Sequence, residues 1–103
     1  MPFQPSLDLF SREDLEDLLQ LIGEKQIKSL MFADGSISSE NKWNTAMHIL
    51  NRLPPSVTSI IFGVCPYPHA DFHELTRILA SNENIIELEV RVRLINKPFA
   101  LPI

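Results

Sequence analysis

The sequence predicts a small α/β protein in which a parallel three-stranded sheet carries helices on one side. The first observation is an apolar pattern at offsets 0, 3 and 5, found in three segments that start at Ile27, Val57 and Ile85. These starts are 30 and 28 residues apart, and the alternation within each segment has the period of two that is typical of a strand. The second observation is a stretch with helical spacing before each strand. Because a helix joins every pair of successive strands, we expect the strands to run parallel.

Branched and aromatic residues fill most of the pattern positions of the three strands, which are Ile27, Leu30, Phe32, Val57, Ile60, Phe62, Ile85, Leu88 and Val90. The third strand has the clearest alternation, so we expect it to be long. Its core face holds Leu88, Val90, Val92 and Leu94, and its outward face holds Glu87, Glu89, Arg91 and Arg93. The outward face of the third strand is therefore charged.

The first helix is predicted from about residue 12 to about residue 22. Its apolar face consists of Leu15, Leu18, Leu19 and Ile22. Ser11, with Asp14 three residues on, forms a variant of the capping box. Gly23 is a natural residue for the end of this helix, because glycine readily adopts the left-handed conformation there.

The second and third helices have the same kinds of signal. The second has a single apolar stripe, formed by Trp43, Ala46, Met47, Leu50 and Leu53. Ser38 or Ser39 caps it, and Pro54 ends it because proline disfavours helix in the residue before it. The third is short, with Asp71 and Glu74 as its capping pair and an apolar face of Phe72, Leu75, Ile78 and Leu79.

The composition fits one folded domain over residues 1–103. Hydrophobic residues make up 45% of the chain and charged residues 21%, as in ordinary globular proteins. We divide the domain into units of about residues 12–35, 39–65 and 71–95, followed by an apolar tail at residues 96–103. The net charge of −4 leaves no strongly basic surface for phosphates, so no nucleic-acid partner is expected.

The same composition argues against a membrane protein. No apolar run approaches the roughly 18 residues that a membrane-spanning helix needs, so no membrane association is expected. Cys65 is the single cysteine and has no partner for a disulfide within the chain, which fits a reducing compartment. We therefore expect a cytoplasmic protein.

One nine-residue segment carries a family resemblance. Residues 57–65, which read VTSIIFGVC, match the pattern L-x-x-L-x-L-x-x-N/C through its last position. The chain therefore resembles the ribonuclease-inhibitor-like class of leucine-rich repeats, and residues 53–60 are similar to the repeats of bacterial leucine-rich effector proteins. Gly35 and Arg93 stand at the last pattern position in the other two units. The resemblance implies a short, degenerate solenoid that binds proteins, has no chemistry of its own, and, as an effector, would be delivered into a host cell.

In such an arrangement, side chains between the pattern positions face solvent on the strand-lined side of the sheet. The candidate partner-binding residues on that side are Met31, Ile61, Glu87, Glu89 and Arg91. An apolar pair bordered by charge is typical of a modest protein-binding site. Two alternatives remain open, in which the tail at residues 98–103 or a second copy of the chain covers Met31 and Ile61. Unpaired edges on the first and third strands favour self-association.

The alternative function is that of a single-cysteine thiol oxidoreductase. A strand that leads into Cys65-Pro66-Tyr67 and then a helix resembles the active-site turn of glutaredoxins. Only 38 residues follow Cys65, too few for the rest of a thioredoxin-like fold. The short remainder of the chain therefore favours a structural role for the Cys65 thiol. We expect no enzyme activity and no catalytic residue.

A metal site is the last chemical possibility in this loop. Cys65, His69 and His73 are spaced four residues apart, a spacing from which zinc ligands can come. The predicted cap at Asp71 separates the two histidines, so they do not share a helical face. No metal and no other cofactor are therefore expected.

Overall fold

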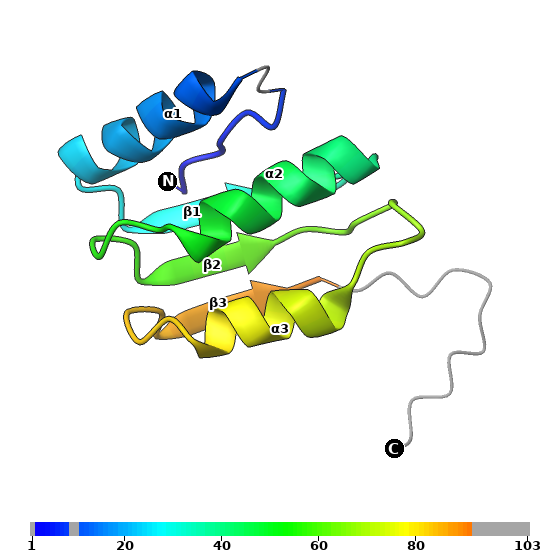
Figure 1. The fold of residues 1–103 in the computed structure, drawn as a ribbon. Helices are drawn as coiled ribbons and strands as arrows, with labels where there is room; N and C mark the ends of the chain where they lie inside the picture. Colours follow the sequence, from blue (N-terminus) through cyan, green and yellow to red (C-terminus); the bar gives the residue numbers. More distant parts are fainter. Residues whose placement is uncertain (1, 9–10, 92–103) are drawn as a thin grey trace.

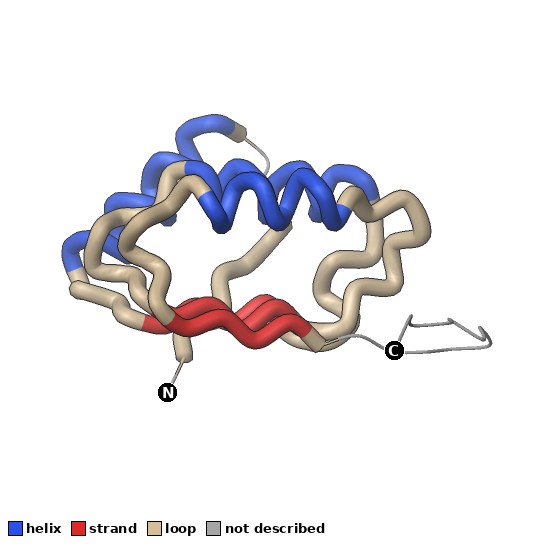
Figure 2. Tube along the Cα trace, turned by 90° about the horizontal axis from the view of Figure 1, so that it is seen from below, coloured by secondary structure: helices blue, strands red, loops and turns tan. Residues whose placement is uncertain are grey.

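The structure is a computed structural model, and it describes residues 2–8 and 11–91 of the chain. Its elements alternate in the order α1 (Arg12–Glu24), β1 (Ser29–Phe32), α2 (Glu40–Asn51), β2 (Ser59–Phe62), α3 (Phe72–Ala80) and β3 (Glu87–Val90). The strands form a parallel sheet in the order β1-β2-β3 (Figure 1). Figure 2 shows two layers, with the helices together on one face of the sheet. The predicted α/β fold class is confirmed.

All three helices begin at a predicted cap. The side chains of Ser11, Ser39 and Asp71 each accept a hydrogen bond from the backbone N–H three residues further on. These bonds satisfy amide groups that have no partner within the helix itself. The choice left open between Ser38 and Ser39 is decided in favour of Ser39.

The end of α1 differs from the prediction. The helix continues to Glu24, and Gly23 lies inside it. The left-handed residue is Gln26, with φ 52°. Its N–H donates to the Gly23 carbonyl at 3.1 Å, and the N–H of Ile27 donates to the Ile22 carbonyl at 3.1 Å. This pair of bonds is the usual closure of a helix end by a left-handed residue, and the Gln26 side-chain amide is a second donor to the Gly23 carbonyl, at 3.0 Å.

The core lies between the sheet and the helices. Leu30, Ile60 and Phe62 point into it from β1 and β2 and are 0% exposed. Trp43 of α2 is 4% exposed, as predicted for a core residue, and its ring contacts Phe62 edge to face with a centroid distance of 6.1 Å. Its indole N–H donates to Glu74 at 3.2 Å, so the polar atom of this large side chain is satisfied.

The third strand is more exposed than predicted. β3 ends at Val90, and all four of its residues are exposed. Leu88 is 51% exposed and Val90 38%, although both point to the helix side with their register partners in β2. The reason is the position of β3 at the edge of the sheet, where β2 is its one strand neighbour within the described residues. The predicted continuation through Val92, Arg93 and Leu94 lies outside the described residues, as does the tail at residues 96–103.

The opposite edge of the sheet is partly covered by the N-terminal segment. The N–H of Phe3 donates to the Ser29 carbonyl at 2.9 Å, and the N–H of Met31 donates to the Phe3 carbonyl at 2.8 Å. Phe3 thereby forms a parallel bridge with Leu30, and Leu7 is buried nearby at 8% exposure. The free backbone groups of β1 are thus satisfied in part by the chain itself.

Candidate binding face of the sheet

The structure places the predicted binding residues on the face of the sheet that the helices leave uncovered. We call this surface the outer face; it consists of Met31, Ile61, Glu87, Glu89 and Arg91. Alternation along β1 and β2 turns Leu30 and Ile60 toward the helices and the residue after each of them to the opposite side. Met31 is the register partner of Ile61, and Ile61 is the register partner of Glu89. The predicted central column of the outer face is therefore one row across the three strands.

The exposure of the outer-face side chains rises from β1 and β2 to β3. Met31 and Ile61 are half-buried, whereas Glu87, Glu89 and Arg91 are exposed. In the row before that of Met31, on the same face, Ser29 is the register partner of Ser59, and Ser59 is the register partner of Glu87. The outer face is thus neutral over β1 and β2 and charged over β3.

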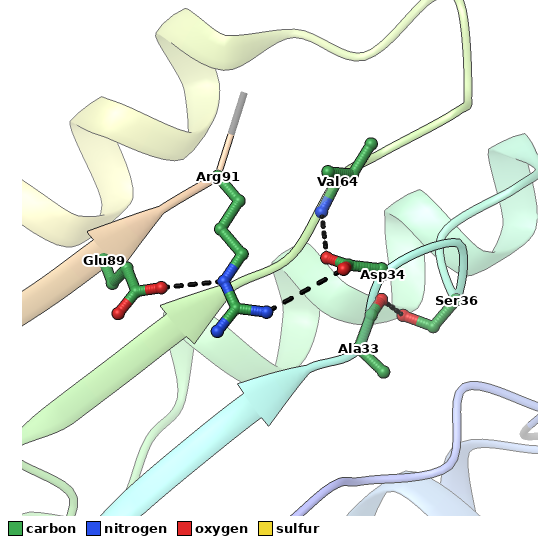
Figure 3. A network of polar contacts seen from close by, with 6 residues as sticks. All are labelled: Ala33, Asp34, Ser36, Val64, Glu89 and Arg91. Atoms are coloured by element: carbon green, nitrogen blue, oxygen red, sulfur yellow. Dashed lines mark hydrogen bonds and ion pairs between the residues drawn. The ribbon is translucent and has the colours of Figure 1, made fainter. Parts of the chain in front are cut away.

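Arg91 joins the charged side of the outer face to the ends of the other two strands (Figure 3). Its guanidinium donates to Glu89 at 2.7 Å and lies 3.8 Å from the carboxylate of Asp34. The other oxygen of Asp34 accepts from the backbone N–H of Val64 at 2.8 Å. The hydrogen bond to Glu89, with smaller contributions from the charges of Glu89 and Asp34, raises the pKa of Arg91. Since these groups are exposed, the network orients side chains more than it stabilises the fold.

Gly63 allows the backbones of the first two units to approach closely at this point. Its N–H donates to the Phe32 carbonyl at 2.7 Å. A Cβ at position 63 would lie 2.5 Å from that carbonyl oxygen and 2.7 Å from the N of Asp34. Gly35 is the second special glycine, because its φ of 79° is left-handed and its N–H donates to the Val64 carbonyl at 2.9 Å.

Sequence reasoning recognised only part of this junction. Aspartate, glycine and serine are typical of turns, so the sequence Asp34-Gly35-Ser36 indicates a turn between strand and helix, and the N–H of Ser36 donates to the Ala33 carbonyl at 3.1 Å. The contact from Asp34 to Val64 was missed, because the two residues are 30 positions apart. The available signal was an aspartate before a glycine at a strand end, together with Gly63 at the equivalent point of the next unit.

Cys65 lies in the loop between β2 and α3 with its thiol directed inward. The side chain is half-buried, and its sulfur donates a weak hydrogen bond to the Ile37 carbonyl at 3.5 Å. Burial raises the pKa of Cys65, and a backbone hydrogen bond from Tyr67 offsets this in part. The helix α3 begins only at Phe72, so the thiol does not stand at a helix N-terminus. Both features favour the protonated thiol at neutral pH, whereas a redox-active cysteine needs the thiolate.

The histidines near Cys65 do not gather around it. The ring of His69 contacts Tyr67 edge to face at a centroid distance of 5.7 Å, and His73 lies in the first turn of α3. Within residues 2–8 and 11–91, no group of three or more histidine, cysteine or acidic residues is arranged to hold a metal ion.

A second surface, which the sequence reasoning missed, is an apolar groove between α3 and β3. We call it the edge groove; it has a volume of about 500 Å³ and is lined by Phe72, Leu75, Leu79, Ile86, Leu88 and Val90. Phe72 is 48% exposed and Ile86 is 76% exposed. The signal was the apolar face predicted for the third helix together with Leu88 and Val90 of the third strand, because among the described strands none follows β3 to cover these side chains.

Comparisons of the chain with protein-family models, with curated proteins and with solved structures give no match. In the part of the chain that the structure describes, no helix combines the length and the apolar character that crossing a membrane requires. The outer face and the edge groove are therefore the features from which a function can be inferred.

Proposed function

We propose that the protein is an interaction module that binds a partner protein through its outer face. The observation that carries this proposal is the placement of the described helices on one side of the sheet, which leaves Met31 and Ile61 uncovered on the other (Figure 2). Charged residues flank the apolar pair on β3. An apolar centre with a polar rim is the usual composition of a protein-binding surface.

The size of the outer face limits what kind of contact it can make alone. Three strands at a spacing of about 4.8 Å, each four residues long at about 3.3 Å per residue, present an area of roughly 200 Å². A stable interface buries about 800 Å² per partner. The partner therefore also has to contact neighbouring surface, and the loops that contain Asp34 and Val64 are the closest such surface at the carboxyl ends of the strands.

The repeated helix and strand support a relationship to leucine-rich repeats, which bind proteins through the strand-lined side. The same resemblance makes a bacterial effector acting inside a host cell our more specific proposal. The raised pKa of Cys65 and its distance from the start of α3 argue against the thiol oxidoreductase. Accordingly, the proposal assigns no catalytic residue and no cofactor, and it places the protein in the cytoplasm.

The test compares two changes of the same kind on opposite sides of the molecule. Ile61→Asp puts a charge in the centre of the outer face, and Leu21→Asp puts one on α1, where Leu21 is 37% exposed. Circular dichroism first establishes that both variants are folded. Immobilised wild-type protein is then used to capture a partner, and the purified partner is titrated against all three proteins.

We expect Ile61→Asp to weaken binding at least about tenfold, because a central residue of an interface carries much of the binding free energy. Leu21→Asp should bind as the wild type does. A partner that binds folded Ile61→Asp as tightly as it binds the wild type would show that the outer face is not the binding site.

A further inference from the structure

The outer face belongs to a parallel sheet, and this fact indicates the kind of structure that binds there. The described helices all lie on the other side of the sheet (Figure 2). Parallel sheets occur mostly with helices on both faces. Met31 and Ile61 stand in the middle of the outer face, and their neighbours along the strands are small residues, which are Ser29, Ala33, Ser59 and Gly63. A helix can therefore approach the strands closely at the apolar pair.

The charges of the outer face follow along β3 in the order acidic, acidic, basic. The guanidinium of Arg91 donates to Glu89 at 2.7 Å and lies 3.8 Å from the carboxylate of Asp34 (Figure 3). Among the described residues, the side chain of Glu87 makes no hydrogen bond and no ion pair. The guanidinium of Arg91 thus serves Glu89 and Asp34, and the carboxylate of Glu87 remains uncompensated. Within the described residues, the outer face keeps an excess of negative charge.

This excess of negative charge limits which partners fit the outer face. A second copy of the chain carries the same excess there, so two outer faces repel each other. Nucleic acid carries a negative charge on every phosphate and is repelled as well. A protein segment with lysine or arginine side chains is attracted instead, and the net charge of −4 of the whole chain acts in the same direction.

The spacing of the two glutamates matches the spacing of side chains on a helix. Glu87 and Glu89 are two positions apart on one face of β3, which is about 6.6 Å along the strand. Residues four apart on a helix are separated by about 6 Å along its axis and lie on the same side. A helix that runs along the strands therefore brings basic residues at i and i+4 beside the two glutamates while its apolar side contacts Met31 and Ile61.

From these observations we infer that the partner of the outer face is a basic amphipathic helix that lies along the strands. This inference rests on the proposed function and specifies the chemistry of the partner. The apolar side chains of the helix pack on Met31 and Ile61. Its lysine or arginine residues at i and i+4, on the flank next to β3, face Glu87 and Glu89. An acidic helix of the same shape is repelled by these two carboxylates.

The experiment uses two synthetic amphipathic peptides of about 16 residues as probes. The first has leucines on its apolar side and lysines at i and i+4 on one flank, and the second has glutamates in place of these two lysines. Lysine and glutamate have similar helix propensities, so the free peptides should have similar helicity, which circular dichroism checks. Each peptide is titrated at low ionic strength into isotope-labelled protein, and NMR spectroscopy records the shifts of the backbone amide signals.

We expect the lysine peptide to shift the amide signals of Met31, Ile61 and Glu89. It should bind at least about tenfold more tightly than the glutamate peptide, because the glutamate peptide places carboxylates next to carboxylates. Added salt should reduce this difference, since it screens exposed charges. Equal binding of the two peptides, shifts confined to another surface, or unshifted signals at millimolar peptide would each overturn the inference.

Glu87→Lys tests the charge of the outer face directly. This variant should reduce the preference for the lysine peptide to less than about threefold, since it replaces the uncompensated carboxylate with a cation. Asp17→Lys, the same kind of change at an exposed position of α1, is the matched control and should keep the full preference. Glu87→Gln covers the case in which Glu87→Lys does not fold, and it should lower the preference to a smaller extent. An unchanged preference in folded Glu87→Lys would contradict the inferred contact.

The purified partner captured by the wild-type protein distinguishes a failure of this inference from a failure of the proposed function. A partner that both Ile61→Asp and Glu87→Lys weaken supports the basic helix on the outer face. A partner that Ile61→Asp weakens and Glu87→Lys does not weaken binds the outer face without a basic contact, so the inference alone fails. A partner that neither variant weakens contradicts the proposed function itself.

Discussion

The first two strands and the third strand carry the same apolar pattern but end in different surroundings. Leu30 and Ile60 are 0% exposed, whereas Leu88, at the equivalent position of β3, is 51% exposed. All three point to the helix side of the sheet, as their register shows. The comparison teaches that periodicity sets the direction of a side chain, whereas its burial depends on neighbours on both sides.

The two edges of the sheet also differ in how far neighbouring segments cover them. The first unit is covered by α1 and by the segment around Phe3, which together complete its core. The third unit has α3 above it and β2 beside it and leaves the edge groove open. Within the described residues, the segment around Phe3 thus pairs with the edge of β1, and no segment pairs with the free edge of β3.

The largest expected effect comes from the same substitution in an inner strand and in the edge strand. Leu30→Ala should lower the free energy of unfolding by about 2–5 kcal/mol, because it opens a cavity in a filled core. Leu88→Ala should lower it by less than about 1 kcal/mol, because much of that side chain already contacts water. Chemical denaturation at low protein concentration measures both. Equal losses would show that β3 is as buried as β1 in solution.

A smaller effect is expected at the two glycines that join the first two units. Gly63→Ala should cost about 2–3 kcal/mol, since its Cβ would meet backbone atoms that cannot move without breaking the strand pair. At position 35 an added Cβ would meet no other atom within 4 Å. Gly35→Ala should therefore lower the free energy of unfolding by about 1 kcal/mol, the cost of a left-handed backbone at an alanine. Thermal unfolding of both variants shows which substitution destabilises the protein more. A smaller loss for Gly63→Ala than for Gly35→Ala would contradict the close approach of the two backbones at Gly63.

The helix caps provide a comparison of the units with each other. Ser39→Ala and Asp71→Ala each remove the acceptor for a first-turn amide and should cost about 1 kcal/mol. Because a cap is a local contact, the two losses should be similar if the units unfold together. Amide hydrogen exchange then distinguishes units that unfold together from a third unit that opens separately. Faster exchange confined to α3 in Asp71→Ala would show that the third unit opens separately.

The smallest effect is the pH dependence that comes from Cys65 in the second unit. Burial raises the pKa of this thiol in the folded protein, so the folded state holds its proton more tightly than the unfolded state does. This contribution to stability is therefore complete below the unfolded pKa of about 8.5 and is lost as the pH rises through the folded pKa. Cys65→Ala should flatten the fall in stability between these two values.

The same pKa predicts the reactivity of the thiol. Alkylation of Cys65 should be slow at neutral pH, with a midpoint above the value of about 8.5 that is usual for a free cysteine. A midpoint well below that value would support the alternative function of a thiol oxidoreductase. Measured beside a small thiol compound as reference, the profile separates a structural cysteine from a catalytic one.

Local features of the fold were predictable from the sequence because they depend on a few adjacent residues. The caps at Ser39 and Asp71 need only a side-chain oxygen and an amide three residues away. The strands follow from alternation, and the parallel sheet follows from a helix between each pair of strands. The row that joins Met31, Ile61 and Glu89 also follows, since parallel strands with the same pattern align in register.

Contacts between distant segments required the tertiary structure. The bridge of Phe3 to β1 and the hydrogen bond from Val64 to Asp34 join segments that lie 27 and 30 residues apart along the chain, and neither contact follows from the pattern within one element. The exposure of Leu88 was not predictable from its own strand, because it depends on whether anything lies beyond the last unit. The sequence by itself determined the elements, their order and the faces to which side chains point. Only the packing of whole elements decided which of those faces are covered, because burial is a property of neighbours and not of pattern.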